Sequence, residues 1–92
     1  MHVLVLTQHQ CAFCAQAQVI LDRLSADYGF TVATLDVRTP EGEALALANG
    51  MLFPPGIFVD GEALCYGRPS ERKLRKEFER RSQSIREHLG SS

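Results

Sequence analysis

The chain has 92 residues, of which 45% are hydrophobic and 23% are charged, and its net charge is −1 at pH 7. This length supports one small domain, and the composition is that of a globular protein rather than a disordered one. No apolar run approaches the roughly 18 residues of a membrane-spanning helix, which excludes a membrane-spanning protein and leaves no membrane partner to expect.

The beginning of the chain and its cysteines indicate the compartment. Residues 1–10, MHVLVLTQHQ, lack a basic leader and the longer apolar core of a secretion signal. Three cysteines, an odd number, fit a secreted disulfide scaffold poorly and fit a reducing compartment with one reactive pair better. We therefore expect a cytoplasmic protein.

The first half of the chain alternates between strand and helix patterns. Residues 2–8 are apolar and β-branched, which predicts a buried strand. Apolar residues then recur at spacings of three and four along one helix face, namely Cys14, Ala17, Leu21, Leu24 and Tyr28. This helix should end at Gly29, and the alternating residues 30–37 predict a second strand.

The second half begins with a short helix and a hairpin. Thr39 and Pro40 are a suitable N-cap and first helical residue for a helix that stops at Asn49–Gly50. Residues 56–67 predict two strands around the turn dipeptide Asp60–Gly61.

A final helix follows Ser70, which can cap it. Its inward face should carry Leu74, Phe78, Ile85 and Leu89. Residues 71–87 contain seven Lys or Arg against four Glu. The two signs alternate and no aromatic residues suited to base stacking lie between them, so we interpret the charges as a solvated helix face and expect no nucleic-acid partner.

The predicted order is β-α-β-α-β-β-α, in which the early strands form a parallel pair and the hairpin adds antiparallel strands. The fold class is therefore α/β, with a four-stranded mixed sheet flanked by helices. We expect a single domain over residues 1–89, a flexible end at 90–92, and a monomer.

Cys11 and Cys14 form a CxxC pair where the first strand gives way to the first helix. A helix N-terminus favours an anion and so stabilises a thiolate, the nucleophilic form of cysteine. Cys14 lies one helical turn further on, within reach for a small disulfide ring, which predicts attack by Cys11 and resolution by Cys14.

Other interpretations of the cysteines are weaker. A zinc site needs about four ligands, and even with His9 as a third ligand no fourth is evident. A purely structural disulfide would close too short a loop to gain much entropy. We expect His9 to be a surface histidine and Cys65 to fill the core as a small hydrophobic residue.

A second motif, GMLFPPGIFVDG at residues 50–61, places prolines directly before an apolar strand. Together with the N-terminal CxxC and the element order, it makes residues 2–80 resemble the thioredoxin fold, and within it the glutaredoxin-like branch. The resemblance implies a cis peptide bond at Pro55, facing the cysteine pair, and assigns Gly67 to the family's glycine after the fourth strand. It further implies that the residue before that proline, Pro54, pairs its backbone with the substrate cysteine.

The chain also departs from the glutaredoxin pattern. Gln8 stands where those proteins have a lysine that holds a glutathione carboxylate, Phe53 replaces a threonine, and Arg68 replaces a glycine. Arg68 either takes over the role of the lysine or is an exposed loop arginine. The substrate groove that the resemblance implies is formed by Phe13, Phe53, Pro54, Pro55, Gly67 and Arg68.

These patterns predict a thiol–disulfide oxidoreductase that reduces protein disulfides and is recharged by a flavin-dependent thioredoxin reductase. A glutathione-dependent glutaredoxin, with glutathione as co-substrate and electron donor, is the first alternative. A non-catalytic thioredoxin-fold module, which binds a partner or holds a metal through its cysteines, is the second. The leading interpretation requires no cofactor beyond the Cys11–Cys14 disulfide.

Overall fold

The computed structural model describes the backbone of residues 1–90 and the side chains of residues 1–83. Its elements are β1 (His2–Thr7), α1 (Ala12–Tyr28), β2 (Thr31–Asp36), α2 (Pro40–Ala48), β3 (Gly56–Val59), β4 (Glu62–Tyr66) and α3 (Glu71–Gly90). The predicted order and all the predicted helices and strands are confirmed. Ile85 and Leu89, predicted for the inward face of the last helix, lie outside the residues whose side chains are described.

The four strands form one mixed sheet in the order β2-β1-β3-β4. β1 and β2 are parallel, with Val3 opposite Val32, whereas β3 runs antiparallel to both β1 and β4. All four residues of β3 are buried, as expected for a strand covered on both faces. The predicted α/β fold with a four-stranded mixed sheet is thus confirmed.

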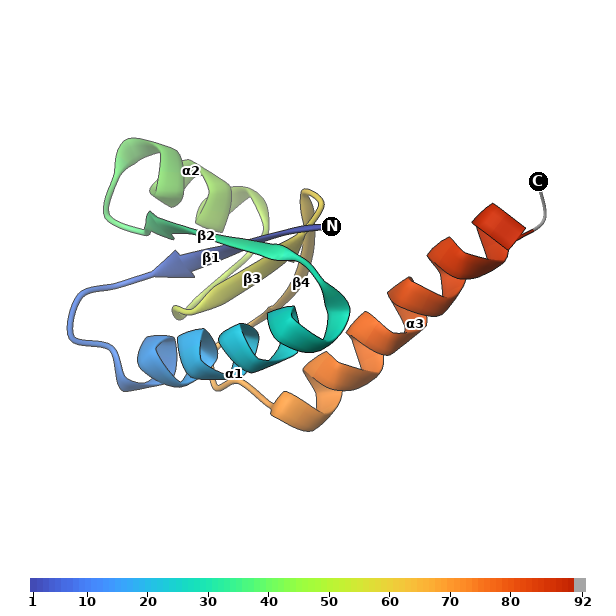
Figure 1. The fold of residues 1–92 in the computed structure, drawn as a ribbon. Helices are drawn as coiled ribbons and strands as arrows, with labels where there is room; N and C mark the ends of the chain where they lie inside the picture. Colours follow the sequence, from blue (N-terminus) through green and yellow to red (C-terminus); the bar gives the residue numbers. More distant parts are fainter. Residues whose placement is uncertain (91–92) are drawn as a thin grey trace.

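Helices cover the two faces of the sheet unequally (Figure 1): α1 and α3 lie on one face and α2 on the other. The larger hydrophobic cluster fills the space under α1 and α3; its buried members are Val3, Val5, Ala17, Leu21, Leu24, Phe30, Ile57, Val59, Leu74 and Phe78. A smaller cluster under α2 contains Leu6, Ala46 and Phe58. Each large apolar side chain removed from water in this way contributes about 1.5–3 kcal/mol to folding.

The short helix α2 is fixed at its start by a close approach to the end of β2. The Thr39 hydroxyl accepts a hydrogen bond from the backbone N–H of Gly42 at 3.0 Å, as its predicted capping role requires. A Cβ at Gly42 would lie 2.2 Å from the carbonyl oxygen of Asp36. Glycine therefore allows α2 to pack directly against the carboxyl end of the parallel strands.

The basic last helix is held to the first by exposed ion pairs. Arg23 pairs with Glu71 at 2.6 Å and Arg75 with Asp27 at 2.9 Å. Such solvated pairs contribute little to stability but fix how the two helices lie on each other. Within the described part of the chain, no helix is both long enough and apolar enough to cross a membrane.

Candidate active site

Cys11 occupies the N-cap position of α1, the residue just before the first helical turn. Its backbone is extended, with φ −112° and ψ 113°, and its sulfur accepts a hydrogen bond from the backbone N–H of Cys14 at 3.3 Å. Its carbonyl accepts from the N–H of Ala15 at 3.1 Å and so begins the helix. The sulfur therefore sits at the positive end of the helix, where free N–H groups stabilise a negative charge, and the residue is half-buried.

The turn before Cys11 contains a conformation that the sequence did not indicate. Gln10 has a φ of +57°, in the left-handed region that residues other than glycine, asparagine and aspartate rarely enter. The turn connects the end of β1 at Thr7 to the start of α1, and it places Cys11 where its side chain is only partly buried. His9 and Gln10 are both exposed, and His9 is the surface histidine that we expected.

Cys14 lies on the inward face of α1, with 3% of its surface exposed. Burial and the hydrogen bond that its thiol makes with the Cys11 sulfur raise the pKa of Cys14 above the ordinary 9.0. The Thr7 hydroxyl and the backbone N–H of Gln8 act in the opposite direction and only partly offset these effects. At neutral pH Cys14 is therefore a thiol.

We expect iodoacetamide at about pH 6.5 to alkylate Cys11 at least about tenfold faster than Cys14, because Cys11 is the more accessible of the two and lies at a helix N-terminus, whereas Cys14 is buried and its pKa is raised. Since the pKa of Cys14 is raised, its thiolate should form only as the pH rises above 9.0, and its alkylation rate should climb there. Peptide mass spectrometry of the reduced protein at a series of pH values measures both rates. Equal rates for the two cysteines in mildly acidic solution would contradict the assignment of roles.

The loop that contains Pro54 and Pro55, called here the double-proline loop, leads into β3, whose first residue, Gly56, lies opposite Leu6 near the end of β1. The peptide bond between Pro54 and Pro55 is cis, the form that the sequence resemblance implied for this bond. Pro55 is buried, and its carbonyl accepts a hydrogen bond from the N–H of Gly67 at 2.8 Å. Gly67 has a φ of +84°, a conformation that is unfavourable for residues with a side chain. The structure thus brings together two of the residues expected in the substrate groove.

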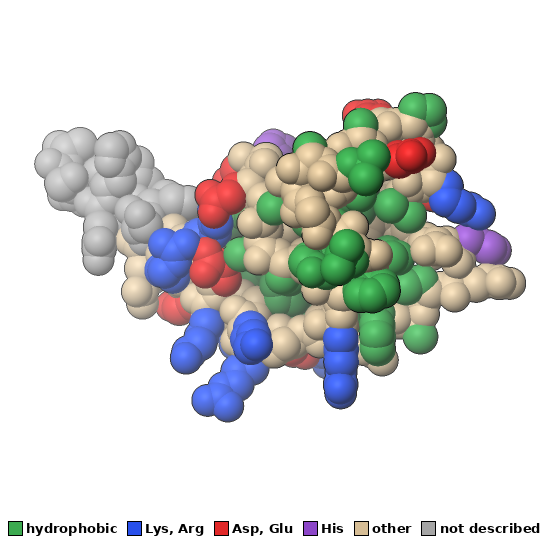
Figure 2. Space-filling model, turned by 180° about the vertical axis from the view of Figure 1, so that it is seen from behind, with side chains coloured by type: hydrophobic (Ala, Val, Ile, Leu, Met, Phe, Trp, Pro, Cys, Tyr) green, Lys and Arg blue, Asp and Glu red, His purple; other side chains and the backbone are tan. Residues whose placement is uncertain are grey.

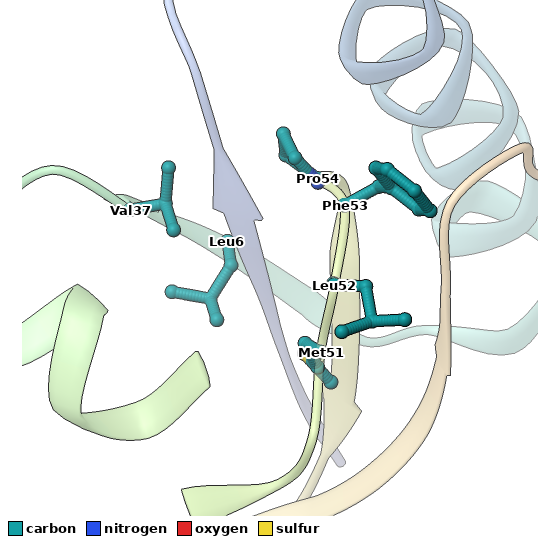
Figure 3. A pocket seen from close by; sticks show the side chains of 7 residues that line it. Leu6, Val37, Met51, Leu52, Phe53 and Pro54 are labelled. Atoms are coloured by element: carbon teal, nitrogen blue, oxygen red, sulfur yellow. The ribbon is translucent and has the colours of Figure 1, made fainter. Parts of the chain in front are cut away.

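A small apolar hollow of about 40 Å³ lies beside this loop (Figure 3). It is lined by Leu6, Val37, Met51, Leu52, Phe53, Pro54 and Gly56, which come from β1, the segment after β2, the loop leading into β3 and the start of β3 itself. A pocket for a small organic ligand or cofactor has several hundred Å³, so this hollow is far too small to enclose one. It is suited instead to receive the edge of an apolar side chain.

The rim of the hollow is unusually apolar for an exposed surface. Leu52 and Phe53 have 72% and 65% of their surface exposed. Sequence reasoning named Phe53 but missed Leu52, Leu6 and Val37; for Leu52 the only signal was its place in the apolar run before the prolines. Exposed apolar side chains beside a reactive group are typical of a protein-binding surface.

Two further predicted groove residues lie apart from the hollow. Phe13, in the first turn of α1 and directly between the cysteines in sequence, is 42% exposed. Arg68 is exposed and lines a different hollow, beside β4 and α3. The residues lining the hollow by the prolines include neither of them.

The surroundings of the cysteines bear on whether they could be metal ligands. In the side chains that the structure describes, no three residues among His, Cys, Asp and Glu come together in a group that could hold a metal ion. Cys65 is only half-buried: it packs against the larger core cluster and lines the hollow that contains Arg68. The expectation that it fills the core is therefore met only in part, and burial raises the pKa of its thiol.

Known proteins are similar to this chain in sequence and in fold. A probable thioredoxin from Archaeoglobus fulgidus is 29% identical over 70 residues, covering 76% of this chain and 77% of that protein. A mutant thioredoxin from Halobacterium salinarum, 27% identical, superposes with a TM-score of 0.64 over 85% of this chain and 71% of its own. Oxidised thioredoxin O2 from Arabidopsis thaliana, 18% identical, superposes with a TM-score of 0.65 over 86% and 72% of the two chains. No protein-family model matches the sequence.

Proposed function

We propose that the chain, which is similar to thioredoxins in sequence and fold, is a thiol–disulfide oxidoreductase that reduces protein disulfides in the cytoplasm. The observation that carries the proposal is that the two cysteines lie in different surroundings, which suit them to different roles. Cys11 is accessible, and its sulfur accepts a backbone hydrogen bond at a helix N-terminus. Cys14 is buried and held as a thiol behind it.

The reaction follows from these different roles. The Cys11 thiolate attacks one sulfur of the substrate disulfide; a bond forms between the two sulfurs, and the other substrate sulfur leaves as a thiolate that takes up a proton. Cys14 then loses its proton and attacks the Cys11 sulfur, which releases the second substrate thiol and closes the Cys11–Cys14 disulfide. The substrate has gained two electrons from the enzyme and two protons, one of which comes from Cys14 and the other from solvent, and an external donor must return the two electrons to the enzyme. We propose a flavin-dependent thioredoxin reductase as that donor.

Pro54 supports the choice of a protein substrate over glutathione. The thioredoxin resemblance assigns to Pro54 the backbone pairing with the substrate cysteine, but proline has a carbonyl and no N–H. One of the two backbone hydrogen bonds is therefore impossible, at a cost of about 0.5–1.5 kcal/mol. Glutathione, which offers few other contacts, should lose most, whereas a protein can compensate on the exposed surfaces of Phe13, Leu52 and Phe53.

We expect Pro54→Val to raise kcat/KM for glutathione-dependent disulfide reduction about two- to tenfold, which corresponds to the return of one hydrogen bond. Pro54→Ala is the matched variant, because it restores the same N–H with a smaller side chain. Steady-state kinetics on a glutathione mixed disulfide measures the effect. If neither substitution changes these kinetics, Pro54 does not limit the use of glutathione.

The proposed activity is tested by the dithiothreitol-driven reduction of insulin, followed as precipitation of its reduced chain. We expect the protein to accelerate this reduction in catalytic amounts. An uncatalysed rate in the presence of fully reduced protein would overturn the proposal and favour a non-catalytic binding module.

A further inference from the structure

Four basic side chains on one side of the molecule lack the ion-pair partners that the others have. Arg68, Arg72, Lys73 and Lys76 are exposed, and among residues 1–83 none of them pairs with a carboxylate. The remaining basic side chains of that range are all arginines, and each forms an ion pair: Arg23, Arg38, Arg75, Arg80 and Arg81. We call Arg68, Arg72, Lys73 and Lys76 the basic stripe.

Two residues of the basic stripe, Arg68 and Lys73, line a surface hollow of about 340 Å³ between β4 and α3, and Arg72 and Lys76 lie on the same helix as Lys73. The hollow is lined by Leu64, Cys65, Tyr66, Arg68, Ser70, Lys73, Leu74 and Glu77. Its one acidic lining residue, Glu77, is already bound by Arg80 and Arg81, and the two guanidinium groups lower its pKa. The hollow therefore offers apolar surface and unpaired positive charge together, and Figure 2 shows Lys and Arg side chains projecting next to exposed hydrophobic surface.

This hollow adjoins the proposed active site through the backbone. Gly67 lies between two of its lining residues, Tyr66 and Arg68, and donates its N–H to the carbonyl of Pro55. The segment that lines the hollow is therefore hydrogen-bonded directly to the double-proline loop.

The four charges of the basic stripe are arranged so that an extended acidic chain can meet several of them. Lys73 and Lys76, and Arg72 and Lys76, lie three and four residues apart, which places them on neighbouring positions of α3. With Arg68, which precedes α3, they give this part of the surface four separate positive charges. A strand-like peptide places a side chain every 3.3 Å or so and can meet several of them in turn.

The rest of the chain carries mainly negative charge, which sets the basic stripe apart from it. Residues 1–67 contain two arginines and seven acidic residues, so the positive charge is concentrated on the α3 side. An acidic partner is drawn to that side and repelled elsewhere.

We propose that the basic stripe and its hollow bind an acidic segment of the protein substrate that lies next to the disulfide being reduced. This inference rests on the proposed function and adds to it a class of substrate. Arg68 was expected in the substrate groove from family resemblance alone. In this proposal it is the residue of the basic stripe that follows Gly67 and so lies nearest in sequence to the proposed active site.

The test compares two peptide disulfides of equal length that carry either a run of glutamates or a run of glutamines beside the disulfide. We expect the wild-type protein to reduce the acidic peptide with about tenfold higher kcat/KM at low salt, an advantage that should largely vanish at about 0.5 M salt. Lys73→Gln/Lys76→Gln should lower the rate for the acidic peptide about fivefold and leave the neutral peptide unchanged.

Ala33→Glu/Ala44→Glu is the control, since it alters the net charge by the same amount at exposed positions of β2 and α2 and should preserve the preference. Equal wild-type rates for the two peptides would overturn the inference and leave the proposed function intact. Reduction of neither peptide would instead count against the proposed function. Inhibition by a single-stranded oligonucleotide, with no preference between the peptides, would assign the stripe to nucleic acid and equally overturn the inference.

Discussion

Cys11→Ser should reduce disulfide turnover at least about a thousandfold, because a serine hydroxyl cannot replace the thiolate that begins the reaction. The effect should fall on kcat, since the fold and the surface around the double-proline loop remain. The substitution keeps a side chain that can cap α1, so the helix is expected to stay intact. Insulin reduction and a thermal melt of the same sample separate lost chemistry from lost structure.

Cys14→Ser tests the second half of the same mechanism. This variant should still attack substrate through Cys11, and because nothing resolves the product, a mixed disulfide should accumulate that is visible as a mass increase. In Cys11→Ser/Cys14→Ser no adduct should form. An adduct on Cys65 in the double variant, or none in Cys14→Ser, would contradict the proposed order of events.

Phe78→Ala should remove about 3–5 kcal/mol from the free energy of unfolding. Phe78 is fully buried and stacks on Phe30, with ring centroids 4.6 Å apart, and on Tyr28 at 6.3 Å. Small domains have only about 5–15 kcal/mol of stability in total, so the variant should be close to unfolding. Urea unfolding of the reduced protein measures the loss.

Val19→Ala is the matched surface control, because Val19 lies on α1 with 56% of its surface exposed. Its effect should stay within about 0.5 kcal/mol. A loss of less than about 1 kcal/mol for Phe78→Ala would mean that α3 does not anchor the larger core cluster as the structure shows.

Much of the fold could be predicted because local patterns and tertiary packing agree here. The three-and-four spacing of Cys14, Ala17, Leu21 and Leu24 predicted the face of α1 that is in fact buried. The turn at Asp60–Gly61 fixed the hairpin, and both residues adopt the positive φ that such a turn needs. In these segments the local sequence, over a few residues, is enough to predict the helix or the turn.

The candidate site was only partly predictable, because its finer geometry depends on residues far apart in sequence. The hollow beside Pro54 joins Leu6 and Val37, and no local pattern shows that the two are neighbours. The positive φ of Gln10 is imposed by the connection between β1 and α1 rather than by its own preference. Likewise, the alternating charges of α3 did not reveal which cations are paired, since several partners belong to α1 and β4.

The most direct test of the central claim is NADPH-coupled reduction of a protein disulfide, run once with thioredoxin reductase and once with glutathione and glutathione reductase. We predict turnover in the thioredoxin reductase assay that depends on Cys11 and clearly exceeds turnover in the glutathione assay, because Pro54 and Gln8 each remove an anchor for glutathione. Faster turnover with glutathione would contradict this account and identify the protein as a glutaredoxin, and no turnover in either assay would contradict reduction of protein disulfides altogether.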